Sequence, residues 1–290
     1  MFKFELKLIY ILKIIKTISE LQNQLQQQQN TDKQVALVPT MGALHNGHLS
    51  LIALAKAQAE IVVCSIFVNP TQFTDASDLE KYPRPVEADL AKLEQADCDI
   101  VFMPEALEMY PQKEYWHLDI GAIENRLEGQ FRRGHYQGVM QIVYKLFMAV
   151  KPDLAFFGQK DFQQIQVIER MVEIKNLPVK IVMCPIIRDA DGLAMSSRNI
   201  HLSEEERKHA LILSWALAQL KKSYVIEASE ELRKEAMELI NIEPMVQLEY
   251  LEIVNTEDLD GDITNLNRGI IALVAAKVGQ TRLIDNMILG

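Results

Sequence analysis

The chain has 290 residues, of which 49% are hydrophobic and 24% charged, a composition typical of a globular protein with a large buried core. Its formal net charge of −10 argues against a general nucleic-acid-binding protein, because such proteins usually carry a basic face. No apolar run approaches the ~20 residues that a membrane-spanning helix needs, so we expect no association with a membrane.

The three cysteines predict neither disulfides nor a zinc site. Cys64, Cys98 and Cys184 are odd in number, lie far apart and form no Cys-x-x-Cys pair. Charged residues such as Glu5 and Lys7 interrupt the apolar N-terminal segment, which therefore does not resemble a signal peptide. We expect a protein of the reducing cytoplasm.

Apolar runs alternate with helical patterns from the N-terminus to about residue 187. Residues 10–29 are predicted to be helical, and residues 61–68 form an uninterrupted β-branched run typical of a parallel strand covered on both faces. Five strands are predicted, at residues 35–38, 61–68, 99–103, 153–157 and 179–183. Helices are predicted between them at residues 47–60, 87–95 and 138–150, and after residue 161. This alternation predicts an α/β fold with a doubly wound parallel sheet.

The pattern changes after about residue 187. Two charged helices are predicted at residues 203–222 and 229–240. Strands are predicted at residues 248–254 and 269–276, and residues 281–287 could add a third. This order predicts a smaller α+β domain with an antiparallel sheet. We therefore divide the chain into a domain of residues 1–186 and a C-terminal domain of residues 187–290, which contributes the loop at residues 195–198.

Residues 35–48 combine a buried strand, a tight turn and the start of a helix. Pro39 ends the strand ladder, and Gly42 permits a turn that a Cβ would obstruct. Such a strand–loop–helix unit presents free backbone N–H groups and the positive end of a helix dipole, which together form an anion site, most often for phosphate. His45 and His48 are three residues apart, so both rings lie on one side. Zinc binding is an alternative, but no third ligand stands at the usual spacing, and donation to phosphate oxygens fits better.

Four polar clusters each follow a predicted strand or its exit loop. They span residues 40–48, 69–73, 158–164 and 195–198. Because the carboxyl ends of parallel strands share one edge of the sheet, we expect these clusters to converge. Each cluster alone could be an ordinary turn, since Gly, Asn, Asp and Ser are common turn residues. Four clusters in phase with the strands indicate a shared site.

The later clusters suit a nucleotide and a hydroxy acid. Lys160 is suited to phosphate, and Asp161 could either accept a hydrogen bond from a ribose hydroxyl or cap a helix. Residues 196–198 supply two hydroxyl donors and a guanidinium fork, as in a polyphosphate clamp, although a plain surface loop is an alternative. Gln72 and Gln164 are neutral amides that could hold a hydroxy acid without adding charge. No Gly-x4-Gly-Lys-Ser/Thr motif is present, so the chain is not a P-loop protein.

One motif resembles a known signature. Pro39-Thr-Met-Gly-Ala-Leu-His-Asn-Gly-His48 resembles the HIGH signature of nucleotidyltransferases, and the residues around it are similar to those of the pantoate–β-alanine ligase family. The resemblance continues through Phe67-Val-Asn-Pro-Thr-Gln-Phe73, Tyr82-Pro-Arg84, His135-Tyr-x-Gly138, Phe156-Phe-Gly-Gln-Lys-Asp-Phe-Gln-Gln164 and Asp191-Gly-Leu-Ala-Met-Ser-Ser-Arg-Asn199. Six ordered motifs over residues 35–200 are very specific, whereas the resemblance after residue 200 depends only on pattern and length.

The resemblance implies a fold, a reaction and an assembly. The fold is the Rossmann-like one of HIGH nucleotidyltransferases with a smaller C-terminal domain. The reaction condenses pantoate with β-alanine: the pantoate carboxylate attacks the α-phosphate of ATP to give pantoyl adenylate and pyrophosphate, and the β-alanine amine then displaces AMP. Mg²⁺ is used with ATP. Homodimers are expected, with small-molecule substrates and no nucleic acid as partners.

The resemblance also assigns residues, each by its match to a family motif. Catalytic roles fall on His45, His48, Lys160 and Arg198, with His48 at the position of the catalytic proton donor, although hydrogen bonding to the pentavalent phosphorus is an alternative for that ring. Asn69, Gln72 and Gln164 match the pantoate and β-alanine site, and Asp89 a metal contact. The ATP contacts are Met41, Gly42, Ala43, Leu44, His45, Asn46, Gly47, His48, Gly158, Gln159, Lys160, Asp161, Ile187, Met195, Ser196, Ser197 and Arg198.

Three departures and three alternatives accompany this interpretation. Arg133 replaces the usual proline of the family and Gln141 a small threonine, while about ten extra residues at the N-terminus are expected to reflect an added helical turn or the choice of start site. Another HIGH adenylyltransferase would transfer AMP to a nucleotide acceptor and would lack the pair Gln72 and Gln164. An aminoacyl-tRNA synthetase is disfavoured because the chain is short and acidic. An inactive nucleotide-binding regulator would bind ATP without releasing AMP.

Overall fold

The computed structural model describes residues 12–29, 33–264 and 268–290. Its larger part is a six-stranded parallel sheet of order β1-β4-β3-β2-β5-β6. The strands are β1 (Lys13–Ile15), β2 (Val35–Thr40), β3 (Ile61–Ile66), β4 (Ile100–Phe102), β5 (Leu154–Gly158) and β6 (Lys180–Cys184). The prediction of a doubly wound parallel sheet is confirmed.

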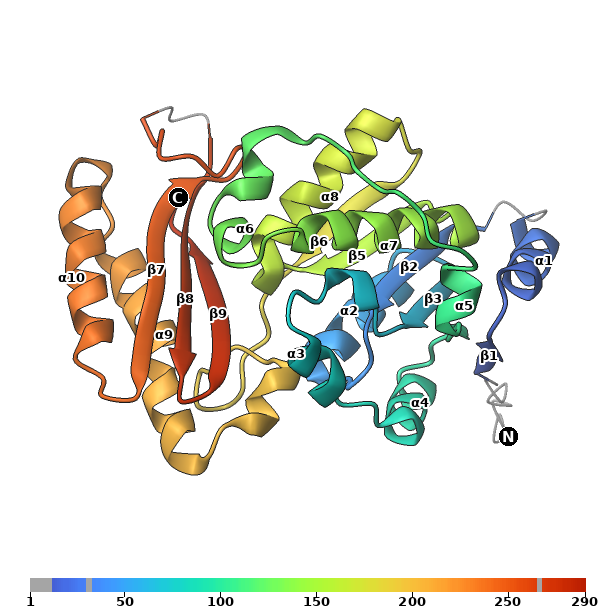
Figure 1. Cartoon of the computed structure of the whole chain (residues 1–290), viewed down its shortest axis with the longest axis horizontal. Helices are drawn as coiled ribbons and strands as arrows, with labels where there is room; N and C mark the ends of the chain where they lie inside the picture. Colours follow the sequence, from blue (N-terminus) through green and yellow to red (C-terminus); the bar gives the residue numbers. More distant parts are fainter. Residues whose placement is uncertain (1–11, 30–32, 265–267) are drawn as a thin grey trace, which may run out of the picture.

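Helices cover both faces of this sheet (Figure 1). Alternate side chains of a strand point to opposite faces, so Val35 and Leu37 of β2 enter one core while Ala36 and Val38 enter the other. The first core is completed by α1 (Ile18–Gln29), α7 (His135–Val150) and α8 (Phe162–Lys175). The second is completed by α2 (Asn46–Lys56) and α4 (Val86–Gln95). Burial on both faces explains why these strands read as continuous apolar runs.

One expectation for the N-terminal part was wrong. Residues 13–15 form the edge strand β1, paired in parallel with β4, rather than part of a helix over residues 10–29. Ile14 and Ile15 are β-branched and suit a strand, but only the exposed edge of β4 supplies the hydrogen-bonding partner. The helix begins later, at Ile18. Residues 1–11, where an added helical turn was expected, lie outside the described residues.

Short elements connect the main ones and carry several polar residues. The stretch from 105 to 137, expected to be irregular, contains two short helices and one 3-10 turn. The short elements are η1 (Pro70–Gln72), α3 (Ala76–Lys81), α5 (Ala106–Met109), η2 (Gly121–Asn125), α6 (Glu128–Phe131), η3 (Gln159–Asp161), η4 (Ser197–His201) and η5 (Ile226–Ala228).

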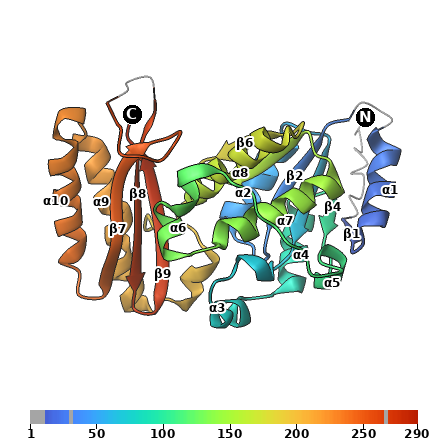
Figure 2. The same ribbon diagram turned by 45° about the horizontal axis from the view of Figure 1, so that its top comes forward.

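The C-terminal part is a three-stranded antiparallel sheet of order β7-β8-β9, as expected (Figure 2). Its elements are α9 (Glu204–Ser223), α10 (Ser229–Asn241), β7 (Val246–Asn255), β8 (Ile270–Val278) and β9 (Thr281–Ile288). One face of the sheet packs on α9 and α10. Side chains of the other face, such as Tyr250 and Leu273, join the core of the larger part. The two parts therefore share buried surface, and the boundary at residues 186 and 187 stays a prediction.

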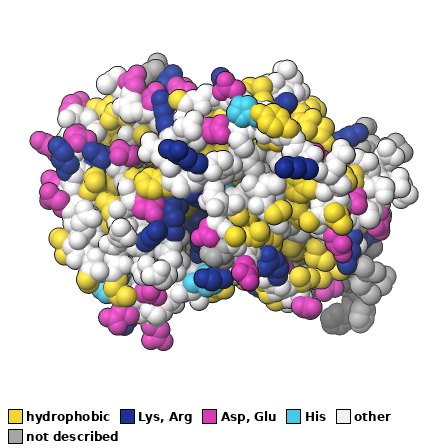
Figure 3. All heavy atoms as spheres, viewed as in Figure 1, with side chains coloured by type: hydrophobic (Ala, Val, Ile, Leu, Met, Phe, Trp, Pro, Cys, Tyr) yellow, Lys and Arg dark blue, Asp and Glu magenta, His cyan; other side chains and the backbone are white. Residues whose placement is uncertain are grey.

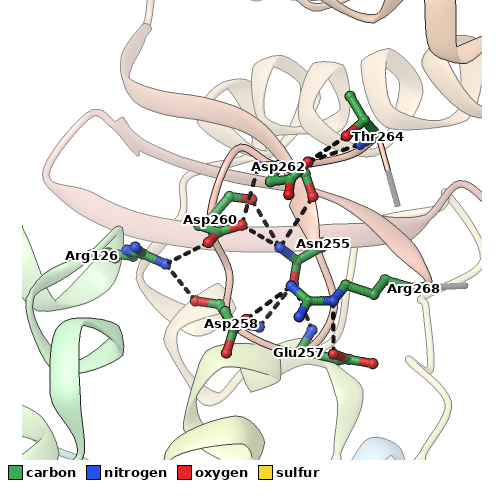
Figure 4. A network of polar contacts seen from close by, with 8 residues as sticks. All are labelled: Arg126, Asn255, Glu257, Asp258, Asp260, Asp262, Thr264 and Arg268. Carbon is green, nitrogen blue, oxygen red and sulfur yellow. Dashed lines mark hydrogen bonds and ion pairs between the residues drawn. The ribbon is translucent and has the colours of Figure 1, made fainter. Parts of the chain in front are cut away.

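Polar contacts hold the loop after β7 against the larger part (Figure 4). Asn255 is fully buried, and its Oδ1 accepts hydrogen bonds from the backbone N–H groups of Glu257 and Asp258 at 3.0 and 2.8 Å. Arg126, which follows η2, donates to the Asp258 carbonyl at 2.8 Å and pairs with Asp260. The contacts from Arg126 therefore join the two parts of the molecule.

The sheet order places a crevice between two central strands. The chain runs from β2 to β3 and β4 on one side, and from β5 to β6 on the other. The strand order reverses between β2 and β5, which end at Thr40 and Gly158. Open α/β sheets bind ligands at the carboxyl ends of the strands beside such a reversal. Among the described helices, none is long and apolar enough to cross a membrane.

Candidate active site

A cleft lies at this reversal point. The ends of β2, β3, β5 and β6, together with α2, α7, α8 and the loop before η4, contribute its walls. Lys and Arg side chains gather in the hollow between the two parts of the molecule (Figure 3). The four polar clusters from the sequence converge in this cleft, as expected from their positions. They contribute Thr40, Met41, His45, Gly47, His48, Asn69, Gln72, Gly158, Lys160, Asp161, Gln164, Met195, Ser196, Ser197 and Arg198 to its lining.

The two histidines cap the helix on which they stand. Nδ1 of His45 accepts a hydrogen bond from the Gly47 backbone N–H at 3.2 Å, and Nδ1 of His48 accepts one from the His45 N–H at 3.3 Å. This reciprocal arrangement is a capping box made by two imidazoles. Because a backbone N–H can only donate, each neutral ring carries its proton on Nε2. Each ring therefore has one donor left for a ligand in the cleft.

Both rings are neutral at pH 7. Burial, followed by the nearby Lys160 ammonium, lowers the pKa of His45 to about 4. Burial, followed by His45 and Lys160, lowers the pKa of His48 to about 3. The ring centroids are 4.1 Å apart, so a charge on one ring would oppose a charge on the other. The pair is suited to hydrogen bonding rather than to carrying positive charge in the free protein.

Asp89 fixes the loop between β2 and α2. Gly42 has φ of 81° and Ala43 φ of 51°, a left-handed conformation that costs free energy for a residue with a Cβ. The Asp89 carboxylate is 1% exposed and accepts from the Ala43 and Leu44 N–H groups at 2.8 and 2.7 Å. These charge-assisted bonds offset the strain. Asp89 does not line the cleft, so its expected metal contact stays a prediction, and its geometry fits a positioning role.

Buried amides form the floor of the cleft beside β3. Asn69 Nδ2 donates to Gln72 Oε1 at 3.0 Å and to the Gly138 carbonyl at 3.1 Å. Tyr110 donates its hydroxyl to Asn69 Oδ1 at 2.7 Å. Gln72 Nε2 lies 3.1 Å from the Met41 sulfur, a weak acceptor that leaves the amide able to donate to a substrate. Gly138 allows α7 to approach η1 this closely, because a Cβ at that position would lie 2.2 Å from a backbone oxygen of η1.

Gln164 completes this side of the cleft from α8. In the described part of the chain its side chain forms no hydrogen bond, in contrast to Gln72. An unpaired carboxamide on a cleft wall retains two donors and an acceptor for a ligand. Both glutamines therefore remain able to bind a hydroxy acid, as their sequence positions suggested.

His135 supports the site, although its sequence position predicted no site role for it. Its Nδ1 donates to the Gln72 carbonyl at 2.7 Å, and its Nε2 accepts from Arg132 at 3.0 Å. Burial, followed by the Arg132 charge, lowers the pKa of His135 to about 4, so this ring too is neutral. It holds the backbone of Gln72 in place. The sequence signal for this residue was the motif His135-Tyr-x-Gly138, which gave it no partner.

The turn η3 brings Lys160 and Asp161 to the cleft. Asp161 occupies the N-cap position of α8, as one alternative held, but its side chain makes no cap hydrogen bond. Gln159 instead turns away from the cleft, and its amide bonds to Asn286 of β9 at 3.1 Å. The expected contact of Gln159 with ATP stays a prediction, and its side chain holds the turn.

The loop before and within η4 forms the opposite rim. Ser196 Oγ accepts from the Arg198 N–H at 3.2 Å, and the Met195 N–H donates to the Ile187 carbonyl at 3.0 Å. The Arg198 guanidinium pairs with Asp78 of α3 at 3.0 Å. Tyr82, for which no site role was predicted, also lines the cleft, and its hydroxyl lies 3.4 Å from Ser197 Oγ.

Some expected ATP contacts lie beside the cleft rather than on its wall. Gly42 is buried in the turn that Asp89 holds. Ala43, Leu44 and Asn46 line a neighbouring depression that shares His45 and Ser196 with the cleft. Within the described residues, no group of three or more His, Cys, Asp or Glu side chains could hold a metal ion. All three cysteines are buried and unpaired.

Comparison with known proteins identifies the family. The model of the pantoate-beta-alanine ligase family matches residues 13–288. The chain belongs to this family. A pantothenate synthetase of Porphyromonas gingivalis is 46% identical, covering 95% of this chain and 99% of that protein. One of Thermoanaerobacter sp. is 44% identical, covering 94% and 97%.

Solved structures of the family have the same architecture. The crystal structure of pantothenate synthetase from Thermus thermophilus has a TM-score of 0.88 and 38% identity, covering 96% of this chain and 99% of that one. Pantoate-beta-alanine ligase from Francisella tularensis, complexed with beta-gamma ATP and beta-alanine, has a TM-score of 0.80 and 32% identity, covering 96% and 98%. As a member of this ligase family, the chain is an enzyme that uses ATP.

Proposed function

We propose that the cleft condenses pantoate with β-alanine through a pantoyl-adenylate intermediate. The observation that carries this proposal is the neutral histidine capping box at the start of α2, which faces a cleft that also contains Lys160, Arg198 and the two glutamines. The pantoate carboxylate and ATP are both anionic, so the barrier to their reaction is largely electrostatic. Hydrogen-bond donors and cations directed at the phosphates lower this barrier. No side-chain nucleophile is needed.

In the first step the pantoate carboxylate attacks the α-phosphorus of ATP, and pyrophosphate leaves. Gln72 and Gln164 hold pantoate, with Asn69 supporting Gln72 through the 3.0 Å bond between their side chains. The Nε2–H groups of His45 and His48 donate to the phosphate oxygens as charge builds up on them. Lys160 and Arg198 neutralise the polyphosphate, with hydroxyl donors from Ser196 and Ser197.

In the second step the β-alanine amine attacks the acyl carbon of the adenylate, and AMP leaves as the acyl–phosphate bond breaks. Gln72 also contacts β-alanine. We assign His48 a hydrogen bond to phosphate rather than proton donation, because its lowered pKa keeps the ring neutral in the free enzyme, and the Nε2–H of a neutral imidazole is a hydrogen-bond donor but too weak an acid to transfer its proton. The remaining ATP contacts are those expected from the sequence, at residues 41–48, 158–161, 187 and 195–198.

Mg²⁺ enters this proposal with ATP. Magnesium is usually held by substrate phosphates, water and one or two carboxylates rather than by an all-protein cage. Asp161 is the carboxylate residue that lines the described cleft, and it fits this limited role. The metal would neutralise phosphate charge and orient the leaving pyrophosphate.

We also propose a cytoplasmic homodimer with the domain boundary at residues 186 and 187. The resemblance to the family supports the dimer, and three buried unpaired cysteines fit a reducing compartment. Analytical ultracentrifugation tests the assembly, since the molecular mass measured for a dimer would be twice that of the 290-residue chain.

The decisive experiment measures AMP and pantothenate formed from ATP, Mg²⁺, pantoate and β-alanine. We expect equimolar AMP and pantothenate, and ATP–pyrophosphate exchange that needs pantoate but not β-alanine. A nucleotide acceptor replacing pantoate tests the adenylyltransferase alternative and should give no exchange. Bound ATP without any release of AMP would refute the proposal and would favour a nucleotide-binding regulator.

A further inference from the structure

Two adjacent polar residues of β9 are buried where the C-terminal sheet meets the cleft. Asp285 is 5% exposed and Asn286 1% exposed, and they pair with Val274 and Leu273 of β8. A polar group buried without a hydrogen-bond partner costs free energy, so strands rarely place two such residues in a core without a reason. Their partners lie outside the C-terminal sheet, in the loops of the proposed ATP site.

The Asn286 carboxamide makes all three of its hydrogen bonds to η3, the turn that carries Lys160. Its Nδ2 donates to the carbonyl oxygens of Gln159 and Lys160 at 2.9 and 3.0 Å. Its Oδ1 accepts from Gln159 Nε2 at 3.1 Å. These three bonds fix the backbone of η3 from β9, so the Lys160 side chain starts from a defined position at the cleft.

Asp285 holds the second loop in the same way. Its Oδ2 accepts from Arg188 at 2.6 Å, and its Oδ1 accepts from the other guanidinium nitrogen at 3.0 Å. Arg188 also donates to the Gly192 carbonyl at 3.2 Å and so shapes the loop that returns to the cleft at residue 195. The Asn286 N–H donates to Asp285 Oδ1 at 2.8 Å, which links the two contacts.

We propose that Asp285 and Asn286 are positioning residues that align the two halves of the polyphosphate site from the C-terminal sheet, with Asn286 acting through Lys160. This inference depends on the role proposed above for Lys160. Its physical basis is that a cation displaced by about 1 Å from the phosphates can lose on the order of a hundredfold in rate. The C-terminal sheet thus contributes to catalysis without contacting substrate.

A double-mutant cycle tests the coupling between Asn286 and Lys160. Asn286→Ala should lower kcat roughly 10- to 100-fold while leaving KM for pantoate nearly unchanged, because Gln72 and Gln164 lie elsewhere in the cleft. In the Lys160→Ala background the same substitution should have little further effect on kcat, since there is no longer a cation to misplace.

Asn255→Ala is the matched control. Asn255 is an equally buried amide of the C-terminal part, but its bonds lie in the loop after β7 (Figure 4). Its loss should reduce stability and leave kcat per folded molecule unchanged. If Asn286→Ala does not fold, Asn286→Asp takes its place in the same cycle. Aspartate has the same side-chain shape as asparagine, but it places an acceptor oxygen where Nδ2 donates to two carbonyl oxygens, so both of those hydrogen bonds are lost.

Three outcomes would overturn the inference. An unchanged kcat in the Asn286 variant would do so, as would an equal loss of kcat with and without Lys160, which is the pattern of a purely structural residue. An unchanged kcat in Lys160→Ala alone would instead refute the proposed function of the lysine, and the inference would fail with it.

Discussion

At the scale of single residues, the histidines at the start of α2 perform two tasks with different nitrogens. Nδ1 of each ring accepts from the backbone and stabilises the helix, which fixes the tautomer and leaves Nε2–H as the donor. The acceptor and the donor of a neutral imidazole are separate atoms on different edges of the ring, so one can face the helix backbone while the other faces the cleft. This explains why histidine suits both positions better than the serine or glutamate usual in a capping box.

His48→Ala should lower kcat by at least roughly a hundredfold, because it removes one donor to the transition state. It should also cost about 1 kcal/mol of stability through the lost cap. His48→Gln should recover the stability, since an amide oxygen can accept from the His45 N–H, while activity stays well below that of the wild type. Steady-state kinetics and urea unfolding of both variants check this, and wild-type kcat in His48→Ala would refute the assigned role.

Gly47→Ala should separate activity from stability. A Cβ at this position would lie 2.9 Å from the His45 ring, so the ring must move away from its position at the cleft. Alanine is favoured over glycine inside a helix by up to about 1 kcal/mol, so the free energy of unfolding should hardly fall. We expect lower kcat/KM for ATP without loss of stability. Gly261→Ala, where a Cβ would meet open space, serves as the control and should change neither quantity.

At the scale of elements, the site depends on one element holding the backbone of another. The first turn of α4 holds the strained loop before α2 through Asp89. The first turn of α7 holds the backbone of Gln72 through His135. In both cases a buried side chain accepts from or donates to a backbone group that would otherwise be unsatisfied. The substrate-facing residues therefore depend on helices that do not themselves reach the substrate.

Asp89→Asn should weaken the loop before α2, because an NH₂ group cannot accept from a backbone N–H. Losing one charge-assisted bond should reduce the free energy of unfolding by about 1.5–3 kcal/mol and raise KM for ATP. Glu87→Gln, the same change on the exposed side of the same turn, should leave both unchanged. Titration with Mg²⁺ distinguishes the two roles of Asp89: recovery of activity at high Mg²⁺ would support metal binding and contradict positioning.

At the scale of the whole molecule, three buried neutral histidines make stability depend on pH. His45, His48 and His135 have a folded-state pKa of about 4, 3 and 4, against roughly 6.5 in an unfolded chain. Between these values the unfolded chain binds more protons than the folded one, so stability rises with pH. The contribution of these three rings to the free energy of unfolding should be fully present above about pH 6.5. It should fall as the pH is lowered toward 4.

Urea unfolding of the ligand-free protein at pH 7.0 and 5.5 measures this dependence. The free energy of unfolding should be lower at pH 5.5, and His135→Gln should show a smaller difference because one of the three histidines is gone. Carboxylates titrate mainly below this window, so they contribute little to the difference. Equal stability at the two pH values would show that the three rings are not held neutral by burial.

The sequence alone determined the layered α/β architecture, the antiparallel C-terminal sheet and the four polar clusters at the strand ends. Those features depend on local periodicity and on turn residues, which neighbouring positions in the chain encode. The family resemblance named most of the cleft residues from motifs of the same local kind. Because parallel strands end at one edge of the sheet, the convergence of the clusters also followed from the sequence.

Only the tertiary structure decided how those residues are held. The strand β1 needed the open edge of β4, the tautomers of His45 and His48 needed their backbone partners, and Asn286 is 126 positions from Lys160 along the chain. Hydrogen bonds between distant elements leave no periodic signal, since a buried asparagine in a strand looks the same in sequence whatever it contacts. The start of α2 illustrates the division: sequence marked it as a phosphate site, and the fold determined which nitrogen of each ring can serve that phosphate.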